Sequence, residues 1–167
     1  SLPWDGTSPD DNSREYSSTG SDTIRTGDPR LEKSVVNSSI HGTSQDLTIG
    51  EVVTFRLQAY LPQGLMTNLR ITDTLPFGFA YVLNSYNVYS SGFSGTLGTL
   101  VVPPQVIGQN VIFLFSGLTN STQSNNPFYI ELNATVLNSI ENQDGNSKQN
   151  DMSLTWDENT HGPFTTE

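Results

Sequence analysis

Residues 69–75 read Leu-Arg-Ile-Thr-Asp-Thr-Leu, an alternation of apolar and polar side chains that only Asp73 interrupts. Because successive side chains of a β-strand point to opposite faces, this pattern predicts a strand with one buried face. The same alternation recurs along the chain, and no window has the period of an apolar helix face. The predicted strands are 31–36, 52–61, 69–75, 80–82 with 86–89, 97–102, 111–116, 128–137 and 150–156.

Turn-rich segments separate these strands, among them residues 62–68, 103–110 and 117–127, which contain Gly, Pro, Asn and Ser. Short strands at this spacing, with turn signals between them, are typical of two packed antiparallel sheets. We therefore predict an all-β fold, an immunoglobulin-like β-sandwich of about seven to nine strands with an extended N-terminal linker.

Composition divides the chain of 167 residues into three parts. Residues 1–30 are rich in Ser, Asp, Gly and Pro, which predicts an extended linker. Residues 31–157 hold the predicted strands of the sandwich, and residues 158–167 form a tail. The sequence SLPWD at residues 1–5 resembles SLTWD at residues 153–157, so we interpret the N-terminus as the tail of a preceding tandem repeat.

Charge and composition exclude several classes of protein. Seven basic and seventeen acidic residues give a net charge of −10, which excludes a nucleic-acid-binding face. The longest strongly apolar run, residues 111–115, is too short to insert into a membrane. The sequence has no Cys, so another device must stabilise a domain that we expect to be extracellular and monomeric. Its expected partners are neighbouring repeats of the same polypeptide and an unknown surface ligand.

Three polar residues occupy positions where the alternation requires apolar ones. Lys33, Asp73 and Asn150 each share the inward face of a predicted strand with aliphatic residues two positions away. A lone buried charge costs several kcal/mol unless it is paired, so we expect these three side chains to meet.

Two interpretations of this meeting follow from its chemistry. Burial lowers the pKa of Lys33 and raises that of Asp73, which favours a nucleophilic amine beside a carboxylic acid. Attack of Lys33 Nζ on Asn150 Cγ, with loss of ammonia, would form an intramolecular isopeptide bond. In the alternative interpretation, Lys33 and Asp73 form a buried ion pair and Asn150 is a hydrogen-bond partner.

Three stretches resemble the isopeptide-forming repeat domains of bacterial fimbrial and adhesin proteins: residues 33–35, 49–56 and 71–82. The last contains Asp-Thr-Leu-Pro-x-Gly-x-x-Tyr-Val at residues 73–82, the most specific element. Residues 138–156 are similar to the terminal strand of that family, which carries an Asn. The resemblance covers about residues 31–157. The sequence departs from the family pattern at Phe55, where Tyr is usual, and at Asp151-Met152, where a small residue often follows the Asn.

The resemblance implies the collagen-adhesin A-type pilin fold and a bond between Lys33 and Asn150, with Asp73 as the catalytic proton relay. It also implies a structural stalk or adhesin module of the bacterial cell surface, which performs a single self-cross-linking reaction and no enzymatic turnover. We expect no cofactor for this reaction. Glu131 alternates with apolar neighbours and should face outward, and it is the fallback acid.

A ligand-binding β-sandwich without a cross-link, specific for carbohydrate or dependent on calcium, is the alternative function. Asn142, Asp144 and Asn146 mimic half of a calcium loop, although no bidentate Glu follows at the required distance. Exposed aromatic residues such as Tyr60 and Tyr89 are able to stack on sugars, but cross-strand packing explains them equally well.

Overall fold

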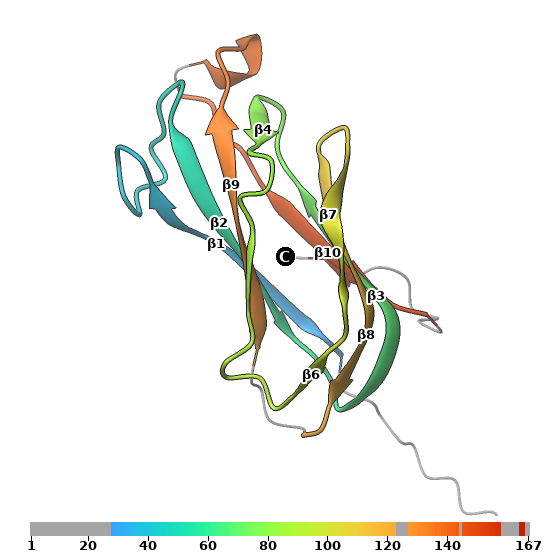
Figure 1. The fold of residues 1–167 in the computed structure, drawn as a ribbon. Helices are drawn as coiled ribbons and strands as arrows, with labels where there is room; N and C mark the ends of the chain where they lie inside the picture. The colour runs from blue at the N-terminus through green and yellow to red at the C-terminus, as the bar shows by residue number, and fades with distance from the viewer. Residues whose placement is uncertain (1–27, 123–126, 144, 158–163, 166–167) are drawn as a thin grey trace, which may run out of the picture.

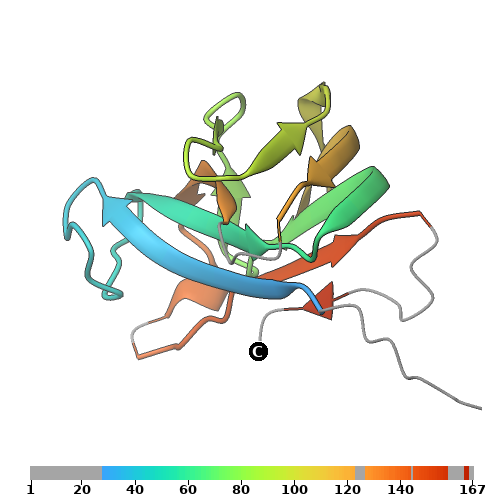
Figure 2. The same ribbon diagram turned by 90° about the horizontal axis from the view of Figure 1, so that it is seen from below.

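Two antiparallel β-sheets pack face to face in the computed structural model, which describes residues 28–122, 127–143, 145–157 and 164–165 (Figures 1 and 2). The first sheet has the order β1-β2-β9-β4, and β5 also pairs with β9. The second has the order β11-β10-β3-β8-β6, and β7 also pairs with β8. The strands of the first sheet are β1 (Arg30–Ser38), β2 (Val52–Tyr60), β4 (Phe79–Tyr81), β5 (Asn87–Tyr89) and β9 (Phe128–Val136). Those of the second are β3 (Gly64–Thr74), β6 (Gly95–Leu97), β7 (Leu100–Ile107), β8 (Asn110–Asn120), β10 (Asp151–Thr155) and β11 (Phe164–Thr165).

The core lies between the sheets and follows from the alternation in the sequence. In β2 and β9 every second residue is buried, and the register places Phe55 opposite Leu132 and Leu57 opposite Ile130. The second sheet contributes its own inward residues, among them the fully buried Phe113 of β8. Burial of such side chains contributes about 1.5–3 kcal/mol each, so the inward stripes hold the two sheets together.

The prediction of an all-β sandwich is confirmed, but the strands extend further than expected. Parts of the segments 62–68, 103–110 and 117–127, predicted as turns, belong to β3, β7 and β8. Proline is tolerated in β7 because this strand pairs on one side only, with β8, and its register shifts between Val101 and Gln105. The two sheets hold five and six strands, more in total than the seven to nine predicted. The additional strands are short: β4, β5, β6 and β11 have only two or three residues each. Residues 164–165 of the predicted tail form β11, and the repeat-like residues 1–5 lie outside the described residues.

β1 and β10 run in opposite directions along the sandwich. β1 and β9 are both antiparallel to β2, and β9 finishes at Val136, opposite Phe79, which follows shortly after β3. β1 and β3 therefore run toward the same end, whereas β10 is antiparallel to β3 and runs back. We call the end where β1 starts the near end, the lower part of Figure 1, and β10 runs toward it as far as Thr155, opposite Arg70 of β3.

The opposite end of the sandwich, the upper part of Figure 1, is here called the far end. It consists of the β1–β2 loop (39–51), the β3–β4 turn (75–78), the β7–β8 turn with Ile107, and the segment 137–149 after β9. This last segment contains the 3-10 turn η1 (Ile140–Asn142). No helix within the described ranges is long and apolar enough to cross a membrane.

Candidate functional site

The predicted site residues come from both sheets and meet along one side of the sandwich. Lys33 lies on β1, the edge strand of the first sheet, and Asp73 lies on β3 of the second. Asn150 directly precedes β10, whose Met152 pairs with Asp73. β1 contacts β10 across the gap between the sheets, and Figure 2 shows them side by side. The structure therefore brings Lys33, Asp73 and Asn150 together.

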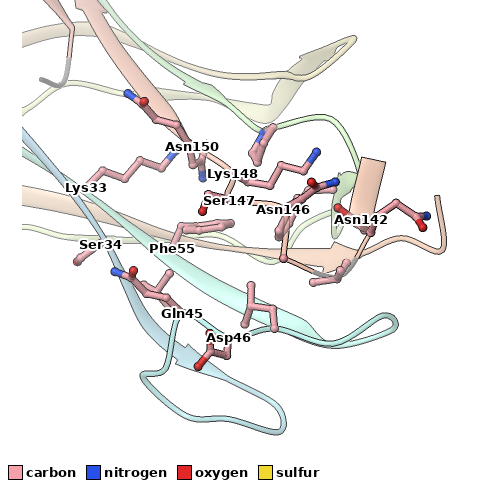
Figure 3. A pocket seen from close by; sticks show the side chains of 18 residues that line it. Lys33, Ser34, Gln45, Asp46, Phe55, Asn142, Asn146, Ser147, Lys148 and Asn150 are labelled. Carbon is pink, nitrogen blue, oxygen red and sulfur yellow. The ribbon is translucent and has the colours of Figure 1, made fainter. Parts of the chain in front are cut away.

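The Lys33 amine is the centre of the cluster. Nζ donates hydrogen bonds to Asp73 Oδ1 and, over 3.2 Å, to the main-chain oxygen of Asp151. The side chains of Lys33 and Asp73 are 6% and 0% exposed. The aromatic ring of Phe55 lies beside the amine, with 5.3 Å between Nζ and the ring centroid. Figure 3 shows the Lys33 side chain extending toward that of Asn150.

The carboxamide of Asn150 is buried without hydrogen bonds. Neither Nδ2 nor Oδ1 has a partner among the described residues, and the same holds for Asp73 Oδ2. A buried polar group left unsatisfied costs about 1–3 kcal/mol, so such groups in a native structure require an explanation. Here they belong to two of the three residues that the chemistry of a cross-link would use.

Burial moves the amine and the carboxyl group toward their neutral forms. Desolvation lowers the pKa of Lys33, although the charge and hydrogen bond of Asp73 act in the opposite direction. Desolvation raises the pKa of Asp73 to about 6 against the opposing effect of Lys33, and the carboxylate of Asp151 adds to the rise. Removal of water is thus the larger effect on both groups, and it favours a proton shared between them.

A groove of about 700 Å³ opens beside this cluster (Figure 3). One wall is formed by residues 33–35 of β1 and 45–47 of the β1–β2 loop, and the other by segment 142–150. Phe55 and Phe79 contribute to its apolar lining, and Asn150 lines it as well. The carboxamide therefore borders a space through which a small molecule is able to leave.

The structure places Glu131 away from this cluster. It lies on the outer face of β9, where Oε1 accepts hydrogen bonds from Arg56 Nε at 2.9 Å and Nη2 at 2.6 Å. Its outward orientation is as predicted. The structure does not bring Glu131 together with Lys33, whose inward-facing side chain contacts Asp73 instead.

The residues of the predicted calcium loop make hydrogen bonds within the fold. Asn142 Nδ2 donates to the main-chain oxygens of Gly78 and Leu137 at 2.7 and 2.8 Å, and Asn146 Nδ2 donates to that of Glu141 at 3.4 Å. Asp144 lies outside the described residues. In the part of the chain that is described, no three His, Asp or Glu side chains gather to hold a metal ion. Calcium binding stays a prediction.

The aromatic residues considered as sugar platforms pack against other side chains. The guanidinium of Arg30 covers the Tyr60 ring at 3.8 Å, and Tyr89 stacks on Tyr129 with ring centroids 4.7 Å apart. These contacts agree with the cross-strand interpretation and occupy ring faces that a sugar would need.

Two features of the site were missed by sequence reasoning. The main-chain oxygen of Asp151 has no sequence signal, because every residue carries such an acceptor. Glu51 is fully buried and accepts hydrogen bonds from Thr48 N, His41 N and His41 Nδ1 at 2.8, 3.0 and 2.9 Å. Burial acts to raise the pKa of Glu51, but these bonds and one from Ser38 hold it well below its usual range. Glu51 thus fixes the loop that forms one wall of the groove.

The fold is that of an immunoglobulin-like β-sandwich domain of the type found in bacterial pilins, as the sequence resemblance implied. One similar structure is BcpA, the major pilin subunit of Bacillus cereus, as its D312A variant. It has a TM-score of 0.54 and 12% identity, over 85% of this chain and 39% of the pilin. Another is the T6 backbone pilin of serotype M6 Streptococcus pyogenes, with a TM-score of 0.50 and 16% identity, over 75% of this chain and 28% of the pilin.

The chain thus spans well under half the length of either pilin. Identities this low establish a shared fold and carry no residue roles to this chain. No protein-family model matches the sequence, and no curated protein is found as a relative.

Proposed function

We propose that this chain is a structural module of a bacterial cell-surface protein, one repeat of a stalk or adhesin, stabilised by an isopeptide bond between Lys33 and Asn150. The observation that carries the proposal is the Asn150 carboxamide, buried without a hydrogen-bond partner among the described residues and next to an amine that is itself desolvated. As an unreacted side chain this amide is destabilising, and a role as the electrophile of a cross-link would account for its burial.

The reaction needs only the three side chains. The neutral Lys33 amine attacks Asn150 Cγ, while the protonated Asp73 hydrogen-bonds to the carboxamide oxygen and stabilises the charge that develops there. A proton then passes from Nζ to Nδ2 through Asp73, the bond between Cγ and Nδ2 breaks, and ammonia leaves. The products are one Nζ–Cγ amide and one ammonia, and Asp73 is regenerated with its proton. Each chain reacts once, so the module is no enzyme.

A cross-link at this position would join the two sheets covalently where no backbone ladder connects them. It would join the edge strand of the first sheet to the start of β10 in the second and close a loop of about 117 residues. Chain-entropy estimates for disulfides closing loops of this size give about 4–5 kcal/mol. The bond would thereby take the role that disulfides have in other extracellular domains, in a chain without Cys.

The pilin-type fold, the acidic composition and the low content of charged residues support a location at the cell surface. Neighbouring repeats of the same polypeptide are the partners that such a module would have. This part of the proposal rests on fold and composition.

Intact-mass spectrometry of the purified chain tests the cross-link. The wild type should weigh one ammonia less than its sequence, and Lys33→Ala should have the full mass expected for that variant. Lys148→Ala is the matched control, since Lys148 is the only other lysine and borders the same groove, and it should still lose ammonia. A wild-type mass equal to the sequence mass would leave the buried ion pair as the correct interpretation.

The second candidate function is a ligand-binding module without a cross-link. The groove of about 700 Å³ favours it, because its volume lies in the range of small-molecule sites and several carboxamide side chains line it. An unmodified mass together with saturable binding of a neutral oligosaccharide would support this candidate over the first.

A further inference from the structure

The two residues that flank Asn150 in the chain are joined to each other by their side chains. Gln149 Nε2 donates a hydrogen bond to Asp151 Oδ1 at 2.9 Å. Both flanking residues are exposed, whereas the polar atoms of the Asn150 carboxamide are buried. Because successive side chains of an extended segment point to opposite sides, a bond between the outer two keeps the middle side chain turned inward. We call this contact the 149–151 bridge.

Asp151 also supplies a main-chain group to the reacting amine. Its main-chain oxygen accepts a hydrogen bond from Lys33 Nζ over 3.2 Å. The next residue, Met152, is fully buried and pairs with Asp73, so the start of β10 is anchored beside the carboxyl group. Asp151 is thus bonded to Asn150 along the chain and at the same time contacts the amine that would attack it.

The hydrogen-bond acceptors around the amine match its neutral form. A neutral amine has two N–H groups and one lone pair, whereas an ammonium group has three N–H groups. Nζ donates to Asp73 Oδ1 and to the Asp151 oxygen, so both hydrogens of the neutral amine are held. For a third N–H the described surroundings offer the ring of Phe55, with 5.3 Å between Nζ and the ring centroid. With the two hydrogens held, the lone pair is the part of the amine left for attack.

The charge of Asp151 acts on the two reacting groups in opposite senses. Desolvation is the main cause of the raised pKa of Asp73, and the Asp151 carboxylate adds to the rise, which favours the protonated acid. Desolvation is also the main cause of the lowered pKa of Lys33, but here the Asp151 carboxylate opposes the shift and disfavours the neutral amine. The hydrogen bonds of Asp151 have no such conflict, because each of them holds a reacting group in place.

We propose that Gln149 and Asp151 are positioning residues for the cross-linking reaction. Their bridge keeps the Asn150 carboxamide turned inward and holds the Asp151 main-chain oxygen against the Lys33 amine. Neither side chain exchanges a proton or an atom with the reacting groups. This role rests on the proposed cross-link, and it adds two residues outside the set of Lys33, Asp73 and Asn150.

The rate at which newly made full-length chains lose ammonia tests this role. Chains are produced in a short pulse of cell-free translation and quenched in acidic denaturant at successive times, and their intact mass gives the fraction that has reacted. Asp151→Ala and Gln149→Ala each remove the bridge. Each should slow the reaction at least about threefold, the effect of losing one ordinary hydrogen bond that orients a reacting group.

A conservative variant separates the hydrogen bond from the charge. Asp151→Asn removes the negative charge but keeps a side-chain oxygen that accepts a hydrogen bond from Gln149. It should therefore react within about twofold of the wild-type rate, well above Asp151→Ala.

The matched control lies beyond the other end of β10. Asn68 Nδ2 donates to Asp157 Oδ2 at 2.5 Å, so this contact also joins an exposed carboxamide to an exposed carboxylate. Asp157→Ala should cross-link at the wild-type rate. In the background of Asn150→Ala, which cannot react, Asp151→Ala and Asp157→Ala should shift the urea midpoint of unfolding equally, because the role of the bridge is in the reaction.

The outcomes distinguish this role from the cross-link itself. A wild type that never loses ammonia would overturn the proposed function and the positioning role with it. Ammonia loss at the same rate in the wild type, Asp151→Ala and Gln149→Ala would overturn the positioning role alone. A slow reaction in Asp151→Asn would assign the effect to charge, and a slow reaction in Asp157→Ala would assign it to folding; either result also overturns the role of the bridge.

Discussion

Lys33 on the edge strand of one sheet donates a hydrogen bond to Asp73 in the interior of the other sheet, forty positions later in the chain. No backbone ladder joins β1 to β3, so this contact is a polar link between the sheets within the apolar core. Breaking one partner of a buried pair costs about 3–5 kcal/mol, which gives the contact a structural role even before any reaction.

Asp73 should be essential for the cross-link and Glu131 should not. Asp73→Asn removes the proton relay but keeps a polar group of similar size, so we expect a chain that retains the full mass of its sequence. Glu131→Gln removes the carboxylate on the outer face of β9, which pairs with Arg56, and should still lose one ammonia. The masses of the two purified variants test this. Ammonia loss in Asp73→Asn would show that another group transfers the proton.

Asn150→Ala is a variant that cannot cross-link. In this variant the buried pair of Lys33 and Asp73 should make the free energy of unfolding depend on pH. The folded state raises the pKa of Asp73 from 3.8 to about 6, so it holds a proton that the unfolded chain has released in this interval. The contribution of Asp73 to stability should therefore be largest below about pH 4 and fall by on the order of 3 kcal/mol as pH rises through 6. For Lys33 the pKa is lowered, so stability should recover toward pH 10.5.

Urea unfolding of Asn150→Ala at several pH values measures this dependence. Asn150→Ala combined with Asp73→Asn is the control, because it lacks the carboxyl group and should lose the decline between pH 4 and 6. If both variants decline equally over this interval, other carboxyl groups are responsible.

Gly78 should tolerate no side chain, because its backbone conformation and its surroundings both require glycine. Its φ is +94°, and a Cβ at this position would lie 2.4 Å from Asn142 Oδ1. Gly78→Ala should displace Asn142 and lower stability by about 1–3 kcal/mol. Gly108→Ala is the control: its φ is +60°, but a Cβ there would meet nothing within 4 Å, so it should lose less. Thermal unfolding of both variants gives the comparison, and equal losses would mean that the contact with Asn142 is unimportant.

Under tension applied at the two termini, the cross-link should protect the loop between Lys33 and Asn150 and leave β10 loaded. β10 follows Asn150 and runs back toward the near end, so residues 151–157 lie on the path of the force. In single-molecule pulling, the wild type should lengthen only by its terminal segments and by the detachment of β10 from β3. Lys33→Ala should release most of the loop of about 117 residues as well. Equal gains in length would show that no covalent bond carries the load.

The sequence by itself determined the strands and the inward face of each, because the two-residue period of a strand is a local property. The alternation in residues 69–75 was enough to place Asp73 in the core, and the same rule placed Lys33 there and turned Glu131 outward. The ends of β3, β7 and β8 were not predictable in this way, since pairing with a neighbour extends a strand through residues that favour turns.

The tertiary structure decided which of these inward residues meet. The contact of β1 with β10 and the hydrogen bond from Lys33 Nζ to Asp151 O join segments more than a hundred residues apart, and the opposite directions of these two strands follow from the pairings of other strands. Such relationships are set by long-range strand register and sheet packing, for which no local sequence pattern carries the information.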